Sequence, residues 1–136
     1  MTELSNIIEH MSKCLHEKGY KKTRLNYIKH QDGLTIIFAI QKSENADNQW
    51  YYNVGTAIDQ LHNQPVTDIS DCDIVQRLDR TLGGMPITAE ILEKGIELWE
   101  KGWGNMESLR RKAIEDKLPL KTKIEVKRFL RVVRLK

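Results

Sequence analysis

The chain has 136 residues, of which 40% are hydrophobic and 30% are charged, a balance typical of a soluble globular protein and not of a disordered one. This length fits one ordinary domain with a real core. The longest apolar run, 36–40, is far shorter than the roughly 20 residues that a membrane span needs. Cys14 and Cys72 lie far apart, which argues against a disulfide scaffold or a zinc ribbon. We therefore expect a soluble cytoplasmic protein, because the N-terminal residues also lack the pattern of a secretory signal.

The net charge of +3 is unevenly distributed along the chain. From Lys117 onward there are eight basic residues and one acidic residue, a charge of 8 − 1 = +7, so residues 1–116 carry 3 − 7 = −4. A mildly acidic body followed by a basic terminal segment is a pattern by which proteins attract an anionic partner.

The first 60 residues predict one helix followed by strands. Apolar residues recur at three- and four-residue steps from Leu4 to Leu15, which predicts an amphipathic helix over residues 3–18. A first strand is expected over residues 23–30. Asp32-Gly33 is strong chemistry for a tight hairpin turn, because both residues tolerate positive backbone angles. Further strands are expected over the ranges 34–41 and 49–58.

Alternation along the two longer strands separates two faces of the expected sheet. One face, which we take as the core face covered by helices, carries Leu34, Ile36, Phe38, Ile40, Tyr52, Val54, Thr56 and Ile58. The opposite face carries Ile37, Ala39, Gln41, Tyr51, Asn53, Gly55 and Ala57.

Residues 59–70 read as a polar connection, and the segment that follows is ambiguous. Residues 72–78 alternate as a fourth strand would, but Val75, Leu78 and Leu82 would also suit a helix; we favour the strand. After Gly83-Gly84 the apolar period changes to 3.6, which predicts helices over residues 88–102, 105–117 and 122–135, the first with Thr88 as its cap. The expected fold is one α+β domain over residues 1–136. It has an antiparallel sheet of three to four strands packed with an N-terminal helix (about 1–82) and a C-terminal helical part (about 86–136).

Several short motifs, taken in order, resemble a known family. They are Gly19-Tyr20-Lys21-Lys22, Gln41-Lys42-Ser43, Asn53-Val54-Gly55 and the acidic segment from Cys72 to Arg77-Leu78. Over about residues 1–80 the chain resembles the bacterial family catalogued as domain of unknown function four-three-zero-four. The resemblance implies an α+β domain of bacterial origin and implies no activity.

The best candidates for a binding site lie on the face opposite the core and beside it: Gln41, Lys42, Ser43, Asn53 and Arg77. Small residues next to Asn53 would leave a shallow, partly polar surface, and Arg77 on a neighbouring strand would add a donor for carboxylate or phosphate. The alternative is structural, in which Ser43 and Asn53 satisfy local backbone groups and Gly55 marks a bulge.

Catalytic and metal chemistry find little support in the sequence. His10 and Cys14 stand four apart on the first helix, but a structural zinc site needs about four ligands and no second pair is present. Asp71 and Asp73 flank Cys72, so their charge should raise the pKa of its thiol and make it a poor nucleophile. Neither a nucleophile elbow nor a phosphate-binding loop occurs. We expect no metal, no cofactor and no identifiable catalytic residue.

The basic terminal helix offers a second hypothesis. A row of cations beside its apolar stripe could bind the phosphates of nucleic acid without sequence preference; the candidates are Lys123, Lys127, Arg128, Arg131 and Arg134. Trp99 and Trp103 could serve as stacking platforms, although their helical spacing is more typical of core residues. Cations near the end of a helix also stabilise it, which is the structural alternative.

These observations favour a small cytoplasmic binding or interaction module over an enzyme. The expected partner is a protein, bound through the sheet surface around Gln41, Ser43, Asn53 and Arg77. Weak nucleic-acid binding by the terminal helix is the alternative, and a hydrolase on the same sheet surface would need a metal or a base that the sequence does not identify.

Overall fold

The computed structural model describes residues 3–42, 50–78, 88–119 and 121–133. Its helices are α1 (Glu3–Glu17), α2 (Ala89–Trp103), α3 (Met106–Ile114) and α4 (Ile124–Val133). Its strands are β1 (Lys21–Thr23), β2 (Asn26–Gln31), β3 (Leu34–Lys42), β4 (Trp50–Ile58) and β5 (Ile74–Arg77). Two 3-10 turns, η1 (Asp59–Leu61) and η2 (Ile69–Asp71), lie between β4 and β5.

Five strands of the described ranges form one antiparallel sheet in sequence order, which confirms the α+β class and corrects the expected three to four strands. The predicted strand 23–30 was wrong in extent, because the chain reverses at Arg24 and makes two paired strands, β1 and β2. Arg24 has a φ of 59°, an uncommon left-handed conformation for a residue other than glycine. No residue of a type that favours turns stands at this reversal, so the sequence pattern could not predict the turn.

The second hairpin turn follows its sequence signal. Asp32 and Gly33 have φ values of 54° and 74°, and Gln31 pairs with Leu34 across them. Positive angles at both central residues are what a two-residue hairpin turn of the favoured twist requires. The Asp32 carboxylate also accepts the backbone N–H of Met106 at 2.7 Å, so the turn holds the first residue of α3.

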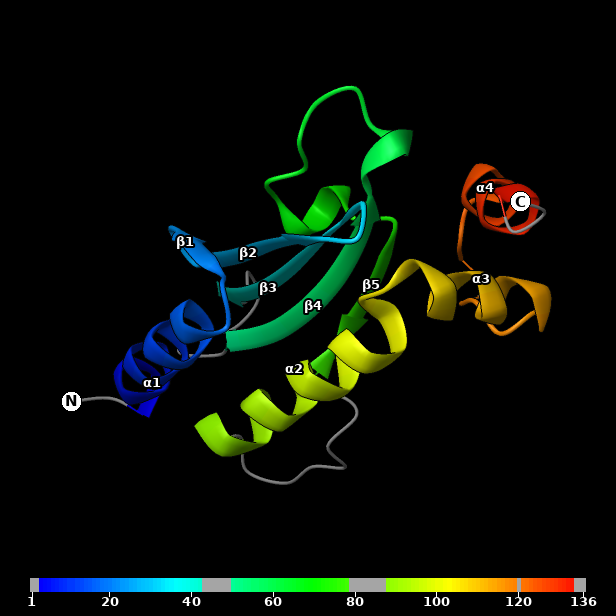
Figure 1. The fold of residues 1–136 in the computed structure, drawn as a ribbon. Coiled ribbons are helices and arrows are strands. Elements are labelled where there is room, and N and C mark those ends of the chain that lie inside the picture. Colours follow the sequence, from blue (N-terminus) through cyan, green and yellow to red (C-terminus); the bar gives the residue numbers. More distant parts are fainter. Residues whose placement is uncertain (1–2, 43–49, 79–87, 120, 134–136) are drawn as a thin grey trace.

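The core face of the sheet is the predicted one. The register pairs Phe38 with Val54 and Leu34 with Ile58, and these side chains are fully buried. Figure 1 shows α1 and α2 side by side beneath this face of the sheet. Met11 of α1 and Ile96 of α2 are both fully buried in the same cluster. Each such side chain stabilises the fold by roughly 1.5–3 kcal/mol through the water it excludes.

One polar residue in this core, Thr56, joins the sheet to α2. Its hydroxyl accepts the Trp99 indole N–H at 2.9 Å and donates to the Trp103 carbonyl at 2.9 Å. Trp99 is 3% exposed and stacks on Trp103 with ring centroids 5.3 Å apart. Trp99 is therefore a core residue and not a platform for nucleic-acid bases.

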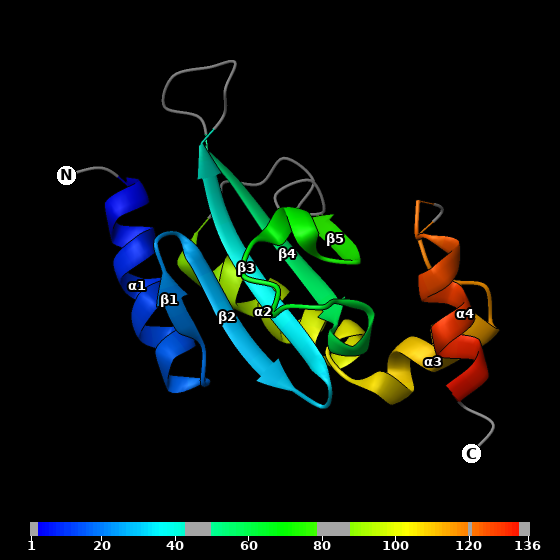
Figure 2. The ribbon, with the colours of Figure 1, turned by 90° about the horizontal axis from the view of Figure 1, so that it is seen from above.

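The opposite face, called here the outer face, is partly covered by the connection 59–73. Val66 and Ile69 are buried there against Ile37, Ala39 and Ala57. Figure 2 looks down on this connection lying over the sheet, with α2 behind the strands. The expected polar connection thus supplies a second, smaller apolar cluster. The segment 72–78 contains β5, so its strand prediction is confirmed and the helical alternative is wrong.

The C-terminal helices begin where capping chemistry predicts. The Thr88 hydroxyl accepts the N–H of Ile91 at 3.2 Å, which confirms this residue as the cap of α2. Asn105 caps α3 in the same way through the N–H of Ser108 at 2.8 Å. α4 packs on α3, and Figure 1 shows this pair beside the end of the sheet. No helix in the described part of the chain is both long and apolar enough to cross a membrane.

Candidate functional site

Three of the predicted site residues meet on the outer face. The register places Gln41 opposite Tyr51 and Asn53 opposite Arg77, on neighbouring strands. The Asn53 amide nitrogen donates a hydrogen bond to the Gln41 side-chain oxygen. Gln41, Tyr51, Asn53 and Arg77, together with Val75, are called the outer-face patch below.

The two larger members of the patch stack on each other. The guanidinium carbon of Arg77 lies 3.5 Å from the centroid of the Tyr51 ring, a close cation–π contact. Both residues take part in further interactions. Val75, next to this pair on β5, is 45% exposed although it is apolar. The patch therefore combines two amide side chains that are hydrogen-bonded to each other, a stacked Arg–Tyr pair and an exposed aliphatic side chain.

The small residues beside Asn53 have a different role from the one expected. A Cβ atom placed on Gly55 would lie 2.8 Å from the Ile69 side chain and 3.0 Å from Cys72. Gly55 pairs regularly with Ile37 and Val75, so it does not mark a bulge. Its missing side chain instead lets the connection 59–73 approach the sheet. The predicted shallow surface is thus filled, at this end, by the chain itself.

Of the other two predicted members of the site, the structure places only the backbone of one. Lys42 is the last residue of β3 and pairs with Trp50. Ser43 lies outside the described residues, so its prediction stays a prediction.

The basic residues in and next to the terminal helix α4 differ in exposure and in their contacts. Lys123 and Arg128 are exposed and Lys127 is half-buried. Arg131 donates to the Ala113 carbonyl at 3.1 Å and lies 3.7 Å from the Asp116 carboxylate, so it ties α4 to the end of α3. Arg134 lies outside the described residues. One of the proposed phosphate-binding cations is therefore also a structural link.

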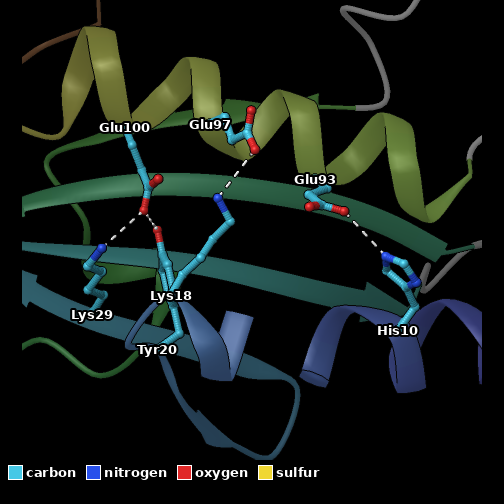
Figure 3. A network of polar contacts seen from close by, with 7 residues as sticks. All are labelled: His10, Lys18, Tyr20, Lys29, Glu93, Glu97 and Glu100. Carbon is cyan, nitrogen blue, oxygen red and sulfur yellow. Dashed lines mark hydrogen bonds and ion pairs between the residues drawn. The ribbon is translucent and has the colours of Figure 1, made fainter. Parts of the chain in front are cut away.

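A network of polar contacts that the sequence analysis did not predict joins α2 to α1 and β2 (Figure 3) and is called the seam below. It consists of His10, Lys18, Tyr20, Lys29, Glu93, Glu97 and Glu100. Glu93, Glu97 and Glu100 lie along one side of α2. Glu97 pairs with Lys18 at 3.4 Å, and Glu100 accepts the Tyr20 hydroxyl at 2.7 Å. The spacing of the three glutamates, next to the apolar positions of the same helix, is the signal that could have revealed this seam.

Lys29 completes the Glu100 end of the seam, with its ammonium 3.5 Å from the carboxylate. Tyr20 is 1% exposed, and its burial, followed by its hydrogen bond to Glu100, raises the pKa of the phenol far above the ordinary value. A neutral phenol donating to a partly buried carboxylate is a stabilising contact. This part of the seam therefore serves structure.

The other end of the seam contains His10 and Cys14, the pair considered as metal ligands. His10 lies 3.3 Å from the Glu93 carboxylate. Burial, followed by a hydrogen bond to Glu93, raises the pKa of Cys14 to about 11, which keeps its thiol protonated. The cavity along these residues, about 460 Å³, is an open groove between α1 and α2. Within the described ranges, no three His, Cys, Asp or Glu side chains are arranged to share a metal ion.

Cys72 is also a poor nucleophile, for a reason beyond the one predicted. Burial is the largest cause that raises the pKa of its thiol to about 12, and the charges of Asp73 and Asp71 add to it. The predicted direction is confirmed, but the dominant cause is the burial of Cys72 against Gly55 of the sheet, which the neighbouring sequence does not show.

Comparison with known proteins connects this fold to one family. No curated protein and no solved structure matches the chain. A family model described as "Domain of unknown function (DUF4304)" matches residues 11–129. The match extends through α3 and most of α4, so the resemblance noted over about residues 1–80 also covers the helical part. The chain therefore belongs to the DUF4304 family.

Proposed function

We propose that the protein is a cytoplasmic bacterial interaction module, one α+β domain along its whole length, that binds an acidic segment of a protein partner through the outer-face patch. The observation that supports this most directly is the Arg77–Tyr51 stack beside the Asn53–Gln41 hydrogen bond. Arginine and tyrosine are enriched among the residues that dominate binding energy at protein interfaces. Held side chains also lose little conformational freedom on binding.

The character of the outer face supports an acidic partner. At the described strand positions of this face there is no Asp or Glu, while Lys21 and Arg77 contribute positive charge. Gln41 is exposed and retains hydrogen-bonding capacity beyond its bond to Asn53. The exposed Val75 adds apolar area next to the stack. A partner segment with carboxylates beside an apolar side chain would complement this surface.

A cytoplasmic setting is consistent with the cysteines. Cys14 and Cys72 are both unpaired, as expected in a reducing compartment. Bacterial origin is what the family resemblance implies.

The proposal is tested by capturing and then reconstituting a partner. Tagged protein is purified from a native cell extract after nuclease treatment, and each captured protein is made recombinantly for titration against purified variants. The double variant Asn53→Ala with Arg77→Ala should weaken binding by roughly 30-fold or more, the effect of losing about 2 kcal/mol at a hot spot. Arg128→Ala, an exposed cation on α4, is the matched control and should leave affinity unchanged.

Two outcomes would reject the proposal. One is a partner that binds the double variant as tightly as the native chain. The other is loss of all capture after nuclease treatment at moderate salt, because that result would favour the alternative of nucleic-acid binding through Lys123, Lys127 and Arg128. A large fall in melting temperature for the double variant would instead assign the two side chains to structure.

A further inference from the structure

The connection 59–73 is a compact loop whose two ends are held together. It starts and ends on neighbouring strands, and the Asp73 N–H donates to the Thr56 carbonyl at 3.0 Å. The Asp73 carboxylate accepts the backbone N–H of Ile58 at 2.7 Å. Val66 and Ile69 anchor the middle of the loop on the sheet. Loops of this length and closure are commonly functional and not mere connectors.

A polar cavity of about 290 Å³ opens between the first half of this loop and β2–β3. Its polar lining comprises His30, Thr35, Asp59, His62, Asn63 and Gln64. This volume is at the lower end of the range for small-molecule sites. The cavity and the outer-face patch lie at opposite ends of the outer face. Thr35 of the cavity pairs with Ala57 near the 31–34 turn, whereas Gln41 of the patch pairs with Tyr51 near the other end of the same strands.

The hydrogen bonds around Thr35 fix the tautomer of a neutral His30. The Thr35 hydroxyl donates its single hydrogen to the Asp59 carboxylate at 2.7 Å. Its oxygen lies 3.0 Å from Nδ1 of His30, so in this bond the ring nitrogen must be the donor. A neutral His30 then has its hydrogen on Nδ1 and an unprotonated Nε2.

His62 is oriented by a second carboxylate. Its Nε2 lies 3.0 and 3.1 Å from the two oxygens of Asp73, whose side chain is 8% exposed. An ionised carboxylate only accepts hydrogen bonds, so Nε2 of His62 is the donor and a neutral ring has an unprotonated Nδ1. Each of the two histidines of the cavity therefore has its N–H committed and one acceptor nitrogen remaining.

The charges around the cavity are mainly negative when both rings are neutral. Asp59 from η1 lines it directly, and Asp73 lies behind His62. A neighbouring cavity of about 750 Å³, which His62 also lines, has Asp71 and Lys123, the residue before α4, in its wall. Two imidazole acceptors and a carboxylate, with two amides beside them, complement a small cation that carries several N–H donors. A metal ion is not the matching ligand, because no three metal-binding side chains of the described residues are suitably grouped.

We infer that this cavity binds an ammonium or guanidinium group, from either a free small molecule or a protein side chain. Asp59 supplies the charge, and the unprotonated nitrogens of His30 and His62 accept hydrogen bonds. A cation without N–H groups would satisfy the charge of Asp59 but would leave both ring nitrogens without a donor, so it should bind less tightly. The inference is independent of the proposed partner-binding patch.

The test is NMR titration of the ¹⁵N-labelled full chain with agmatine, a small molecule that carries both groups. Tetramethylammonium, a cation without N–H donors, is the matched ligand at the same ionic strength. At pH 7.5 agmatine should shift the amide signals of residues 59–66 and of His30, and it should bind at least tenfold more tightly than tetramethylammonium. A parallel titration with a short arginine-containing peptide distinguishes a protein side chain from a free molecule as the source of the cation.

Variants separate the cavity from general charge effects. Asp59→Asn and His30→Gln should each weaken agmatine binding by about tenfold; His30 is exposed, so the second variant should fold normally. Asp68→Asn is the control, because it removes a negative charge from the same loop outside the cavity lining and can still cap η2. Equal binding of tetramethylammonium, equal losses in Asp68→Asn, or no shift in the cavity at millimolar agmatine would each overturn the inference.

Discussion

The contact between Gly55 and the loop above it gives the sharpest test of how the outer face is built. In Gly55→Ala the new methyl group would lie 2.8 Å from Cδ1 of Ile69 and 3.0 Å from both Cβ and Sγ of Cys72. Overpacking of this kind costs about 1–3 kcal/mol. Alanine recovers roughly 0.5–1 kcal/mol because glycine loses more chain entropy on folding. We therefore expect a net loss of about 1–2 kcal/mol in the free energy of unfolding.

The assay combines denaturation with hydrogen exchange. Urea unfolding followed by tryptophan fluorescence measures the loss, which should lower the melting temperature by about 3–10 °C for a chain of this size. Hydrogen exchange should show that amides of residues 59–73 lose protection before those of α1, because the loop is the element that must shift. Gly102→Ala is the matched control, since its methyl group would meet only the end of the Lys112 side chain at 3.8 Å.

Gly102 lies in the last turn of α2, so alanine there should raise stability by a part of the roughly 1 kcal/mol that a helix interior would gain. Opposite signs for the two Gly→Ala changes are the central expectation. A Gly55→Ala protein as stable as the native chain, with unchanged exchange over residues 59–73, would refute the close packing of the loop on the sheet.

Three further predictions follow from single contacts. Tyr20→Phe should lower the free energy of unfolding by about 1.5–3 kcal/mol in urea titration, because it removes a hydrogen bond to the Glu100 carboxylate; a loss below about 0.5 kcal/mol would contradict this role. Thr88→Ala should cost about 1 kcal/mol through the lost cap of α2, and Thr88→Ser should restore most of it. Burial, with Asp73 and Asp71, raises the pKa of Cys72 to about 12, so at pH 8 iodoacetamide should modify it at least 100-fold more slowly than in the urea-unfolded chain. The stability that this raised pKa contributes is present below about pH 9 and is lost as the pH rises toward 12.

Local signals predicted the elements that local chemistry determines. Alternation along β3 and β4 gave the correct core face, because one face of that pair packs against helices and a slip of one residue would expose it. Asp32-Gly33 and Thr88 act within two or three residues, so their turn and cap could be read directly. The β1–β2 reversal at Arg24 could not be, since tertiary pairing and not turn chemistry holds that residue in its conformation.

The sites show the same division between local and distant causes. Gln41, Asn53 and Arg77 are neighbours in the sheet, because antiparallel register follows from the turn and from the alternation of the strands; their role as a binding site stays a prediction. His30 and His62 could not be paired from the sequence, because 32 positions separate them and an irregular loop brings His62 to the cavity.

The loop links the two ends of the outer face in one physical arrangement. Gly55, Ala57 and Ala39 are small, and for that reason the loop can lie close enough for Asp73 to reach both Ile58 and His62. If the loop were displaced, as we expect in Gly55→Ala, the Asp73–His62 contact would loosen and the His62 tautomer would no longer be fixed. Gly55→Ala should therefore weaken agmatine binding in the cavity, although the substituted residue does not line it. Unchanged agmatine affinity in a variant with a demonstrably displaced loop would show that His62 is not needed for binding and would leave Asp59 and His30 as the recognition groups.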